Sequence, residues 1–200
     1  MLPTLPALVW PVAAQELPIE GRHYVAVQTR QPTRNSLEVL EFFAYSCGHC
    51  NEFEPAVDAW QKKLPQDVLF RRIPVAFRES FVIQQKLFFA VEALGLVNQL
   101  HHKVFLAIHS ERKQLDTPEK IGAFAASNGV DRNRFMEALE SFGVAAKVKQ
   151  ASALANGYGI EGTPSIGVNG RWLTSGSLAG SNRKSLEVAE YLVGLARKGA

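Results

Sequence analysis

The chain contains two cysteines, Cys47 and Cys50, which flank a Gly-His dipeptide in the segment "SCGHC". A C-x-x-C pair can be a zinc site, a structural disulfide or a redox pair. Zinc needs a full tetrahedral set of ligands, but there is no second C-x-x-C, and four histidines lie far from the pair: His23, His101, His102 and His109. A disulfide across so short a loop removes little unfolded-state entropy and adds little stability. The redox interpretation is therefore the strongest of the three.

The expected position of the pair suits redox chemistry. Cys47 falls at the start of a helix that directly follows a buried strand, where unpaired N–H groups and the helix dipole favour a thiolate. His49 adds a donor, and a charge when it is protonated, close to the same sulfur, although a solvent-facing role is its alternative. These effects predict a low pKa for the Cys47 thiol, which makes it a good leaving group in disulfide exchange. Cys50, one turn further along, is expected to be less exposed and to act as the resolving thiol.

The elements that must position the pair can be read on both sides of it. Residues 36–45, "SLEVLEFFAY", are nearly continuous in apolar character apart from Glu41, as is typical of a central strand covered on both faces. Residues 68–77, "VLFRRIPVAF", are expected to form a second strand, parallel to the first because residues 50–64 form a crossover helix. This βαβ unit indicates the α/β class.

From Phe81 to about Tyr158 the apolar spacing becomes helical, and three or four helices are expected without an intervening strand. The predicted N-caps are Thr117, before Pro118, and Asp131, and helices are expected to stop at Gly95, Gly129 and Gly143. Three phenylalanines of this block are interpreted first as core, with a binding groove as the alternative: Phe81, Phe88 and Phe89.

The chain then returns to strands. Asn169-Gly170 lies between two extended runs in "GTPSIGVNGRWLTSG", a strong hairpin signal, and an amphipathic helix follows over 185–198. Because the two ends of the chain look like halves of one sheet, the helical block is expected to be an insertion. The expected domains are an α/β domain made of residues 15–76 and 150–200, and an inserted helical domain of residues 77–149.

Residues 1–14, "MLPTLPALVWPVAA", resemble the back half of a signal peptide, with small residues before a possible cleavage site. No positively charged region precedes them, so a truncated start and a modest apolar arm are both open, and the prolines argue against a membrane helix. On the export interpretation the mature chain begins near Gln15 and works in an oxidising compartment, where a cysteine pair can form a disulfide.

The composition describes a globular protein: 46% of the 200 residues are hydrophobic and 20% are charged, which allows one substantial core or two modest ones. The net charge of +3 arises from 22 basic and 19 acidic residues scattered along the chain. Because there is no lysine or arginine run of the kind that grips phosphate backbones, nucleic acid is not an expected partner.

The order of strand, C-x-x-C, helix and a late Thr163-Pro164 before a hairpin resembles the thioredoxin fold. With its helical insertion, the chain is similar to the DsbA-type thiol:disulfide oxidoreductases of the bacterial periplasm, through "LEFFAYSCGHCNEFEP", "KKLP", "SFGV" and "GTPSIGVNGRW". The resemblance covers nearly everything from Gln15 onward. It implies a monomeric periplasmic oxidant that donates a Cys47–Cys50 disulfide to newly exported proteins, is reoxidised by a DsbB-like membrane oxidase, and needs no metal or organic cofactor.

The resemblance also implies roles for single residues. Cys47 would be the substrate-linked cysteine and Cys50 its partner. Pro164 would be a cis-proline facing the pair, rather than an ordinary trans turn proline, and would leave the backbone of Thr163 free to pair with an extended substrate segment. Glu41 resembles the buried acid that moves protons for Cys50, and its alternative is a carboxylate at the sheet edge.

Two positions are expected to tune the redox potential. Arg72 stands where the family has a lysine, and if it pairs with Glu41 it is expected to keep that acid ionised more firmly than lysine does. Gly48 stands where the best-known members have proline, and glycine lacks the preset helical φ, so the disulfide is expected to be less oxidising. Gly-His is the dipeptide of eukaryotic protein disulfide isomerases, and Thr163 before the proline is common among periplasmic isomerases.

Two other functions stay open beside the oxidase. One is a disulfide isomerase or reductant on the same fold, although DsbC-like isomerases carry an N-terminal dimerisation domain, for which few residues precede the first strand. The other is a chaperone-like module that binds unfolded chains through apolar surface around "SFVIQQKLFF" and "TPSIG".

Overall fold

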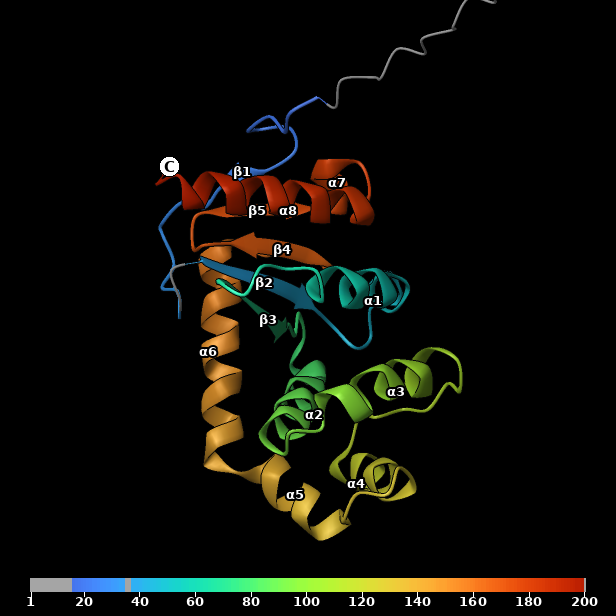
Figure 1. Ribbon diagram of the computed structural model, residues 1–200. Coiled ribbons are helices and arrows are strands. Elements are labelled where there is room, and N and C mark those ends of the chain that lie inside the picture. Colours follow the sequence, from blue (N-terminus) through green and yellow to red (C-terminus); the bar gives the residue numbers. More distant parts are fainter. Residues whose placement is uncertain (1–15, 35–36, 200) are drawn as a thin grey trace, which may run out of the picture.

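The computed structural model describes residues 16–34 and 37–199, and the segment 1–14 that resembles a signal peptide lies outside them (Figure 1). The described residues form a five-stranded sheet in the order β1-β5-β4-β2-β3. Helices α7 and α8 lie at one end of the molecule and α2 to α5 at the other (Figure 1). The bounds of the strands are Val25–Ala26 for β1, Leu37–Phe43 for β2, Val68–Pro74 for β3, Ser165–Val168 for β4 and Trp172–Ser175 for β5.

The central βαβ unit is built from β2, helix α1 (Gly48–Gln61) and β3. β2 and β3 are parallel, with Glu41 opposite Arg72, and this confirms the predicted crossover. All seven residues of β2 are buried because helices cover both faces of the strand. After Phe43 the chain turns, with the Cys47 N–H donating to the Ala44 carbonyl at 3.0 Å, and enters α1. The C-x-x-C pair therefore lies at the carboxyl end of a central strand.

The predicted hairpin joins β4 to β5. Asn169 and Gly170 both have positive φ, 52° and 69°, as a two-residue turn matching the strand twist requires. Gly170 is also required by space, because a Cβ there would collide with the backbone carbonyl of Gln31. β4 lies antiparallel to β2, so the hairpin brings the segment before Ser165 beside the carboxyl end of β2.

The helical block follows β3. Its bounds are Glu79–Phe81 for the 3₁₀ turn η1, Val82–Ala93 for α2, Val97–His109 for α3, Pro118–Ser127 for α4, Arg132–Glu140 for α5 and Phe142–Tyr158 for α6. Thr117 and Asp131 cap α4 and α5 as predicted, accepting from the N–H groups of Lys120 and Arg134. Gly95 and Gly129 follow α2 and α4 in the left-handed conformation.

Gly143 does not end a helix, and that prediction is wrong. Ser141 ends α5 and also caps α6, its hydroxyl accepting from the Val144 N–H, so Gly143 lies in the first turn of α6. Phe88 and Phe89 are buried, as expected of core residues. Phe81 is half-buried and belongs to the 3₁₀ turn before α2.

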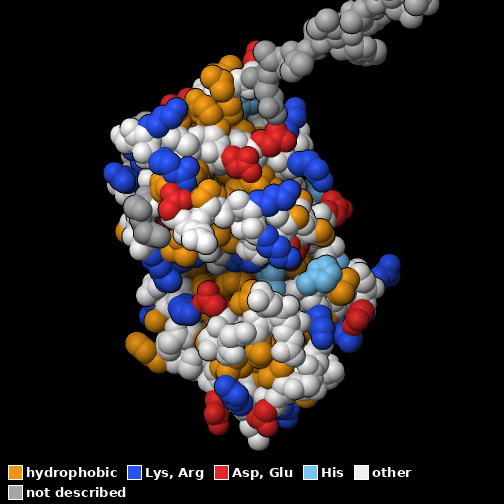
Figure 2. Space-filling view, viewed as in Figure 1, with side chains coloured by type: hydrophobic (Ala, Val, Ile, Leu, Met, Phe, Trp, Pro, Cys, Tyr) orange, Lys and Arg blue, Asp and Glu red, His pale blue; other side chains and the backbone are white. Residues whose placement is uncertain are grey.

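Two apolar clusters cover the two faces of the sheet. The first joins Val39 of β2 to α1 and to α8 (Asn182–Arg197), which follows the short α7 (Gly176–Ala179). The second joins Leu40 and Phe42 to the helices of the inserted block. On the face shown in Figure 2, acidic and basic side chains are interspersed. Within 16–34 and 37–199, no helix is long and apolar enough to cross a membrane.

Candidate active site

Cys47 is the N-cap of α1, and both cysteines are free thiols. Its backbone is extended, with φ −86° and ψ 116°, and its sulfur accepts from the Cys50 N–H at 3.4 Å. A hydrogen bond from the Cys50 thiol lowers the pKa of Cys47 to about 5, with further help from the Thr163 side chain and the backbone N–H groups of Cys50 and His49, against the opposing effect of burial. Cys47 is therefore a thiolate at neutral pH.

Cys50 lies one turn further along α1 and is buried, with 1% of its surface exposed. Its pKa is raised well above the usual value, first because its thiol donates to Cys47 and second because burial disfavours a charge. The two cysteines thus have opposite protonation states although only two residues separate them. In such a pair, the Cys47 sulfur can act as a leaving group in disulfide exchange while the Cys50 sulfur keeps its proton.

The loop before β4 lies against the pair. The Thr163–Pro164 peptide bond is cis, and the Thr163 carbonyl oxygen is 3.3 Å from the Cys47 sulfur. The Thr163 side chain lowers the pKa of both thiols. His49 is exposed at the start of α1, and its backbone N–H contributes to the low pKa of Cys47. The structure therefore brings five of the expected site residues together: Cys47, His49, Cys50, Thr163 and Pro164.

Glu41 is fully buried on β2, away from the sheet edge. Its Oε2 lies 3.2 Å from Arg72 Nε on the neighbouring strand. Arg72 also contacts Glu54 Oε1 at 2.5 Å and Asp58 Oδ1 at 2.6 Å, both from α1. One guanidinium is therefore shared by three carboxylates that come from two elements.

Arg72 favours the ionised form of Glu41, but its shared charge does not outweigh the opposing effects. The expectation that it does so more firmly than a lysine stays a prediction. The pKa of Glu41 is raised to about 8, first by burial and next by the negative charge of Glu54, and Arg72 only partly opposes these effects. Glu41 is therefore mainly protonated at neutral pH.

Four buried or half-buried groups next to the site were not predicted: Glu54, Tyr45, His101 and His109. Nε2 of His101 lies 3.3 Å from Oε2 of Glu54, and its Nδ1 lies 2.8 Å from the Tyr45 hydroxyl. His109 donates to the Tyr45 carbonyl at 2.8 Å. The available signal was the spacing of Cys50 and Glu54, one turn apart on one helix face, which places a carboxylate beneath the pair.

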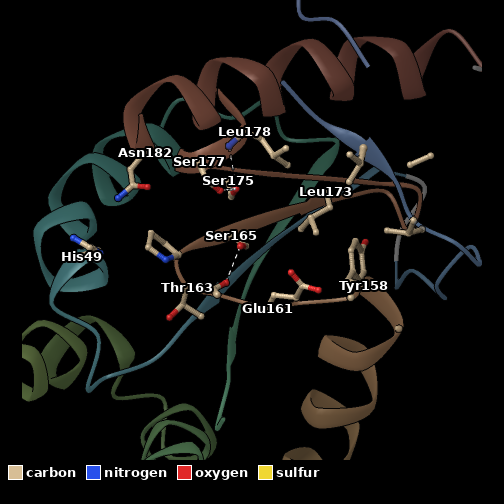
Figure 3. Close-up of a pocket in the computed structure, with 18 of the residues that line it drawn as sticks. His49, Tyr158, Glu161, Thr163, Ser165, Leu173, Ser175, Ser177, Leu178 and Asn182 are labelled. Carbon is tan, nitrogen blue, oxygen red and sulfur yellow. Dashed lines mark hydrogen bonds between the residues drawn. The ribbon is translucent and has the colours of Figure 1, made fainter. Parts of the chain in front are cut away.

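A pocket of about 840 Å³ is lined by His49 of the C-x-x-C segment and by Thr163 of the facing loop (Figure 3). His49 lies toward one side of it and Tyr158 toward the other (Figure 3). Its walls combine apolar side chains such as Leu173 and Leu178 with the hydroxyl groups of Ser165 and Ser175. Thr163 and Pro164 belong to the same lining, so the pocket is continuous with the loop that faces Cys47.

In the described part of the chain, no group of three or more His, Cys, Asp or Glu side chains is placed to hold a metal ion. His101, which the zinc interpretation considered, is engaged by Glu54 and Tyr45.

Comparisons with known proteins agree with this geometry. The DSBA-like thioredoxin domain family matches residues 73–187, and the thioredoxin family matches residues 25–87. The thiol:disulfide interchange protein DsbA of Azotobacter vinelandii is 41% identical over 86% of this chain and 82% of its own. That of Bordetella pertussis is 43% identical over 89% of this chain and 86% of its own. The crystal structure of Pseudomonas aeruginosa DsbA has a TM-score of 0.87 at 35% identity, covering 90% of this chain and 95% of that chain. The family match and the identity to these relatives agree with the strand, the C-x-x-C pair and the proline loop that faces it. The chain therefore belongs to the DsbA-like family of thiol:disulfide oxidoreductases.

Proposed function

We propose that the protein oxidises cysteine pairs in newly exported proteins by donating a Cys47–Cys50 disulfide. The observation that carries this proposal is the opposite protonation of the two thiols, with the pKa of Cys47 lowered to about 5 and that of Cys50 raised. A stabilised Cys47 thiolate favours the reduced form of the protein. The disulfide is then a strong oxidant, because its reduction yields the favoured state.

The exchange proceeds in two displacements. A substrate thiolate attacks Cys47 Sγ, forming a mixed disulfide and breaking the Cys47–Cys50 bond, and Cys50 leaves as a thiolate that takes a proton. A second substrate thiolate then attacks the first substrate sulfur, forming the substrate disulfide and releasing Cys47 as a thiolate. Two electrons pass from the substrate to the protein.

Glu41 is the proposed source of the proton for Cys50. It is buried on β2 and mainly protonated, and its neighbour Glu54 lies one turn from Cys50 on α1. A carboxylic acid with a pKa near the working pH can both give and recover a proton. Arg72 is proposed to tune this proton supply through its ion pairs with the neighbouring carboxylates of Glu54 and Asp58.

Thr163 and Pro164 form the proposed substrate-binding segment. The Thr163 carbonyl already lies beside Cys47, and a substrate in extended conformation can add to this loop by backbone hydrogen bonds. The adjoining pocket can take side chains that flank the substrate cysteine. His49, which is exposed beside the cysteine pair, is proposed to contact the thiolate of the bound substrate.

The remaining proposals concern the setting. We place the protein in the periplasm as a monomer, reoxidised by a DsbB-like membrane oxidase that accepts its two electrons, and without a metal or organic cofactor.

We also propose that residues 15–76 and 150–200 form one domain and residues 77–149 an inserted one. Helix α6 runs through the boundary at 149, so the helix is proposed to couple the two parts.

The experiment is oxidative refolding of a reduced, unfolded protein that has one native disulfide. Wild-type protein with oxidised glutathione is expected to speed disulfide formation. Cys47→Ser should abolish this, and Cys50→Ser should accumulate a mixed disulfide through Cys47. A Cys47→Ser variant that retains full effect would contradict the proposal and would favour the chaperone-like module.

Isomerisation is the second candidate function, favoured by Gly48 at the first position of α1 and by Thr163 before the proline. It is separated from oxidation with a substrate that already holds scrambled disulfides. Rapid rearrangement by the reduced protein, with slow oxidation of reduced substrate, would favour the isomerase.

A further inference from the structure

His101 of α3 is held between two polar partners inside an aromatic cage. Only 3% of its surface is exposed, and its ring lies edge-on to Phe43, Phe88 and Phe105 with centroids 5.1, 5.6 and 5.3 Å away. Nδ1 faces the Tyr45 hydroxyl at 2.8 Å, and Nε2 faces Glu54 Oε2 at 3.3 Å. The cage fixes the orientation of the ring, so these two directions are the ones along which it can donate or accept.

The hydrogen atoms of this group can be assigned from its surroundings. Burial lowers the pKa of His101, so the ring is neutral and has one N–H. His101 Nε2 and Glu54 Oε2 face each other without a hydrogen bond of good geometry, and in residues 16–34 and 37–199 neither atom has another hydrogen-bond partner. If the Tyr45 hydroxyl donates to Nδ1, the N–H lies on Nε2 and points at the carboxylate. This tautomer gives all three groups a partner.

Glu54 and Glu41 compete for one proton. The single positive charge of Arg72 faces Glu41 from β3, while Glu54 and Asp58 face it from α1. Two buried carboxylates beside one guanidinium cannot both be ionised cheaply, so the pair retains a proton near neutral pH. Glu54 is contacted by Arg72 at 2.5 Å and by His101. Glu41 has only the 3.2 Å contact with Arg72 Nε, and neither of its oxygens has a hydrogen bond of good geometry among the described residues.

We propose that His101 is a positioning residue that holds Glu54 as the carboxylate and thereby keeps the shared proton on Glu41, from where it is supplied to Cys50. This inference rests on the proposed role of Glu41 and adds to it a residue from the helical block. The electrostatics agree in direction. Burial pushes the pKa of Glu54 up, but His101 and Arg72 together bring it below its usual value, whereas that of Glu41 is raised.

The test is a carboxyl NMR titration of Glu41 and Glu54 in the reduced full-length protein. His101→Leu should lower the pKa of Glu41 and raise that of Glu54, each by about one unit or more, because a lost hydrogen bond to a buried anion has effects of this size. His101→Gln, whose amide can still donate to Glu54, should restore most of the wild-type titration. His102→Leu is the matched control, because His102 is the exposed neighbour on α3.

Two further measurements separate positioning from packing. In a Glu54→Gln background, His101→Leu should no longer move the pKa of Glu41, whereas a shift of the same size there would overturn the proposal. An unchanged Glu41 titration in His101→Leu would also overturn it. If His101→Leu does not fold, ring nitrogen NMR of the wild-type protein decides: the N–H is expected on Nε2, and an N–H on Nδ1 would contradict the proposal.

These readouts do not depend on oxidase activity. A protein with a reducing Cys47–Cys50 couple would refute the proposed function and leave the Glu41 titration to be judged by itself. A protein that oxidises substrates well but shows no dependence of Glu41 on His101 would refute only this inference.

Discussion

At the scale of single residues, two residues of the same type have opposite protonation states in this site. Cys47 caps a helix, where N–H groups and a neighbouring thiol stabilise negative charge, while Cys50 is buried and donates to it. The same contrast separates Glu41 from Glu54, because only Glu54 accepts a hydrogen bond of good geometry, at Oε1 from Arg72. Protonation in this site is therefore decided by hydrogen-bond partners as much as by residue type.

The low pKa of Cys47 predicts how stability depends on pH. The folded pKa of about 5 lies below the ordinary 9.0, so this thiolate stabilises the reduced form fully above about pH 9 and loses that effect as the pH falls through 5. Cys50, with a raised pKa, stays a thiol in the folded protein, and below about pH 8 it is a thiol in the unfolded chain as well. The free energy of unfolding of the reduced form, relative to the oxidised form, should therefore fall steadily from about pH 8 to pH 5.

Denaturant unfolding of both redox forms at several pH values checks this prediction. Repeating it in Glu41→Gln removes a second group with a shifted pKa in the same window. A difference between the two forms that stays constant with pH would contradict the low pKa of Cys47.

The sequence supported part of this chemistry. An N-cap cysteine follows from local pattern, because it depends on a strand that leads directly into a helix, whereas the burial of Glu41 was implied by the family resemblance. The protonation of Glu41 does not follow from local pattern, because it depends on the negative charge of Glu54, which lies on another element. Sequence spacing within one element carries no information about which side chains meet across elements.

At the scale of elements, the first turn of α1 sets the redox pair. Gly48 is the first residue of the helix, and a Cβ at that position would meet open space. The N–H groups that lower the pKa of Cys47 belong to His49 and Cys50, so the Gly48 N–H is not needed for it. The extended backbone of Cys47 also suits a residue that precedes proline.

Gly48→Pro should therefore fold, gain about 0.4–1 kcal/mol in free energy of unfolding, and make the disulfide more oxidising. The shift should not exceed about 60 mV, the gap between protein disulfide isomerase and the best-known DsbA. Equilibration with glutathione measures it, and Gly48→Ala, which adds a Cβ without fixing φ, should give a smaller shift. A more reducing Gly48→Pro would contradict this role of the first turn.

Arg72 of β3 forms ion pairs with Glu41 of β2 and Glu54 of α1, and its side chain is 8% exposed. Arg72→Met should lower the free energy of unfolding by roughly 3–5 kcal/mol, because it leaves buried carboxylates without their cation. Arg197→Met breaks an exposed pair with Asp67 and should cost about 0–1 kcal/mol. Urea unfolding of the two variants compares them, and equal losses would show that the buried cluster adds no special stability.

Local signals were the most reliable ones at this scale. The Asn169-Gly170 turn and the Thr117 and Asp131 caps were predicted correctly because each is settled within a few residues. Gly143 was misjudged because Ser141 serves as the cap of two consecutive helices. No glycine was needed to end α5.

At the scale of the whole molecule, the helical block and the sheet share one core cluster. Leu40 and Phe43 of β2 pack in the same cluster as Phe88 of α2 and Phe105 of α3. Tyr45, just before the redox pair, is contacted by His101 and His109 of α3. The active-site turn is therefore supported by the sheet on one side and by the helical block on the other.

This shared core predicts one cooperative unfolding transition. Trp60 and Trp172 lie in the cluster on the α8 side of the sheet, so their fluorescence in a Trp10→Phe variant reports on that side. Far-ultraviolet circular dichroism reports mainly on the helices. The two signals should give coincident denaturant transitions, and a helical signal lost well before the fluorescence change would show that the block unfolds independently.

The insertion of a helical block between two parts of a sheet was anticipated from the order of elements. The contacts that attach this block to the active-site turn were not anticipated, because His101 and His109 lie far from Tyr45 in the chain. Those contacts link the helical block to the chemistry of the site.

The reduction potential of the Cys47–Cys50 couple decides whether this protein is an oxidant, and it is measured by equilibrating the protein with glutathione buffers and quantifying free thiols. A stabilised Cys47 thiolate predicts an oxidising couple, at about −180 mV or above, in the range from protein disulfide isomerase to the best-known DsbA. A value near the −270 mV of thioredoxin would contradict the account and identify a reductase on the same fold.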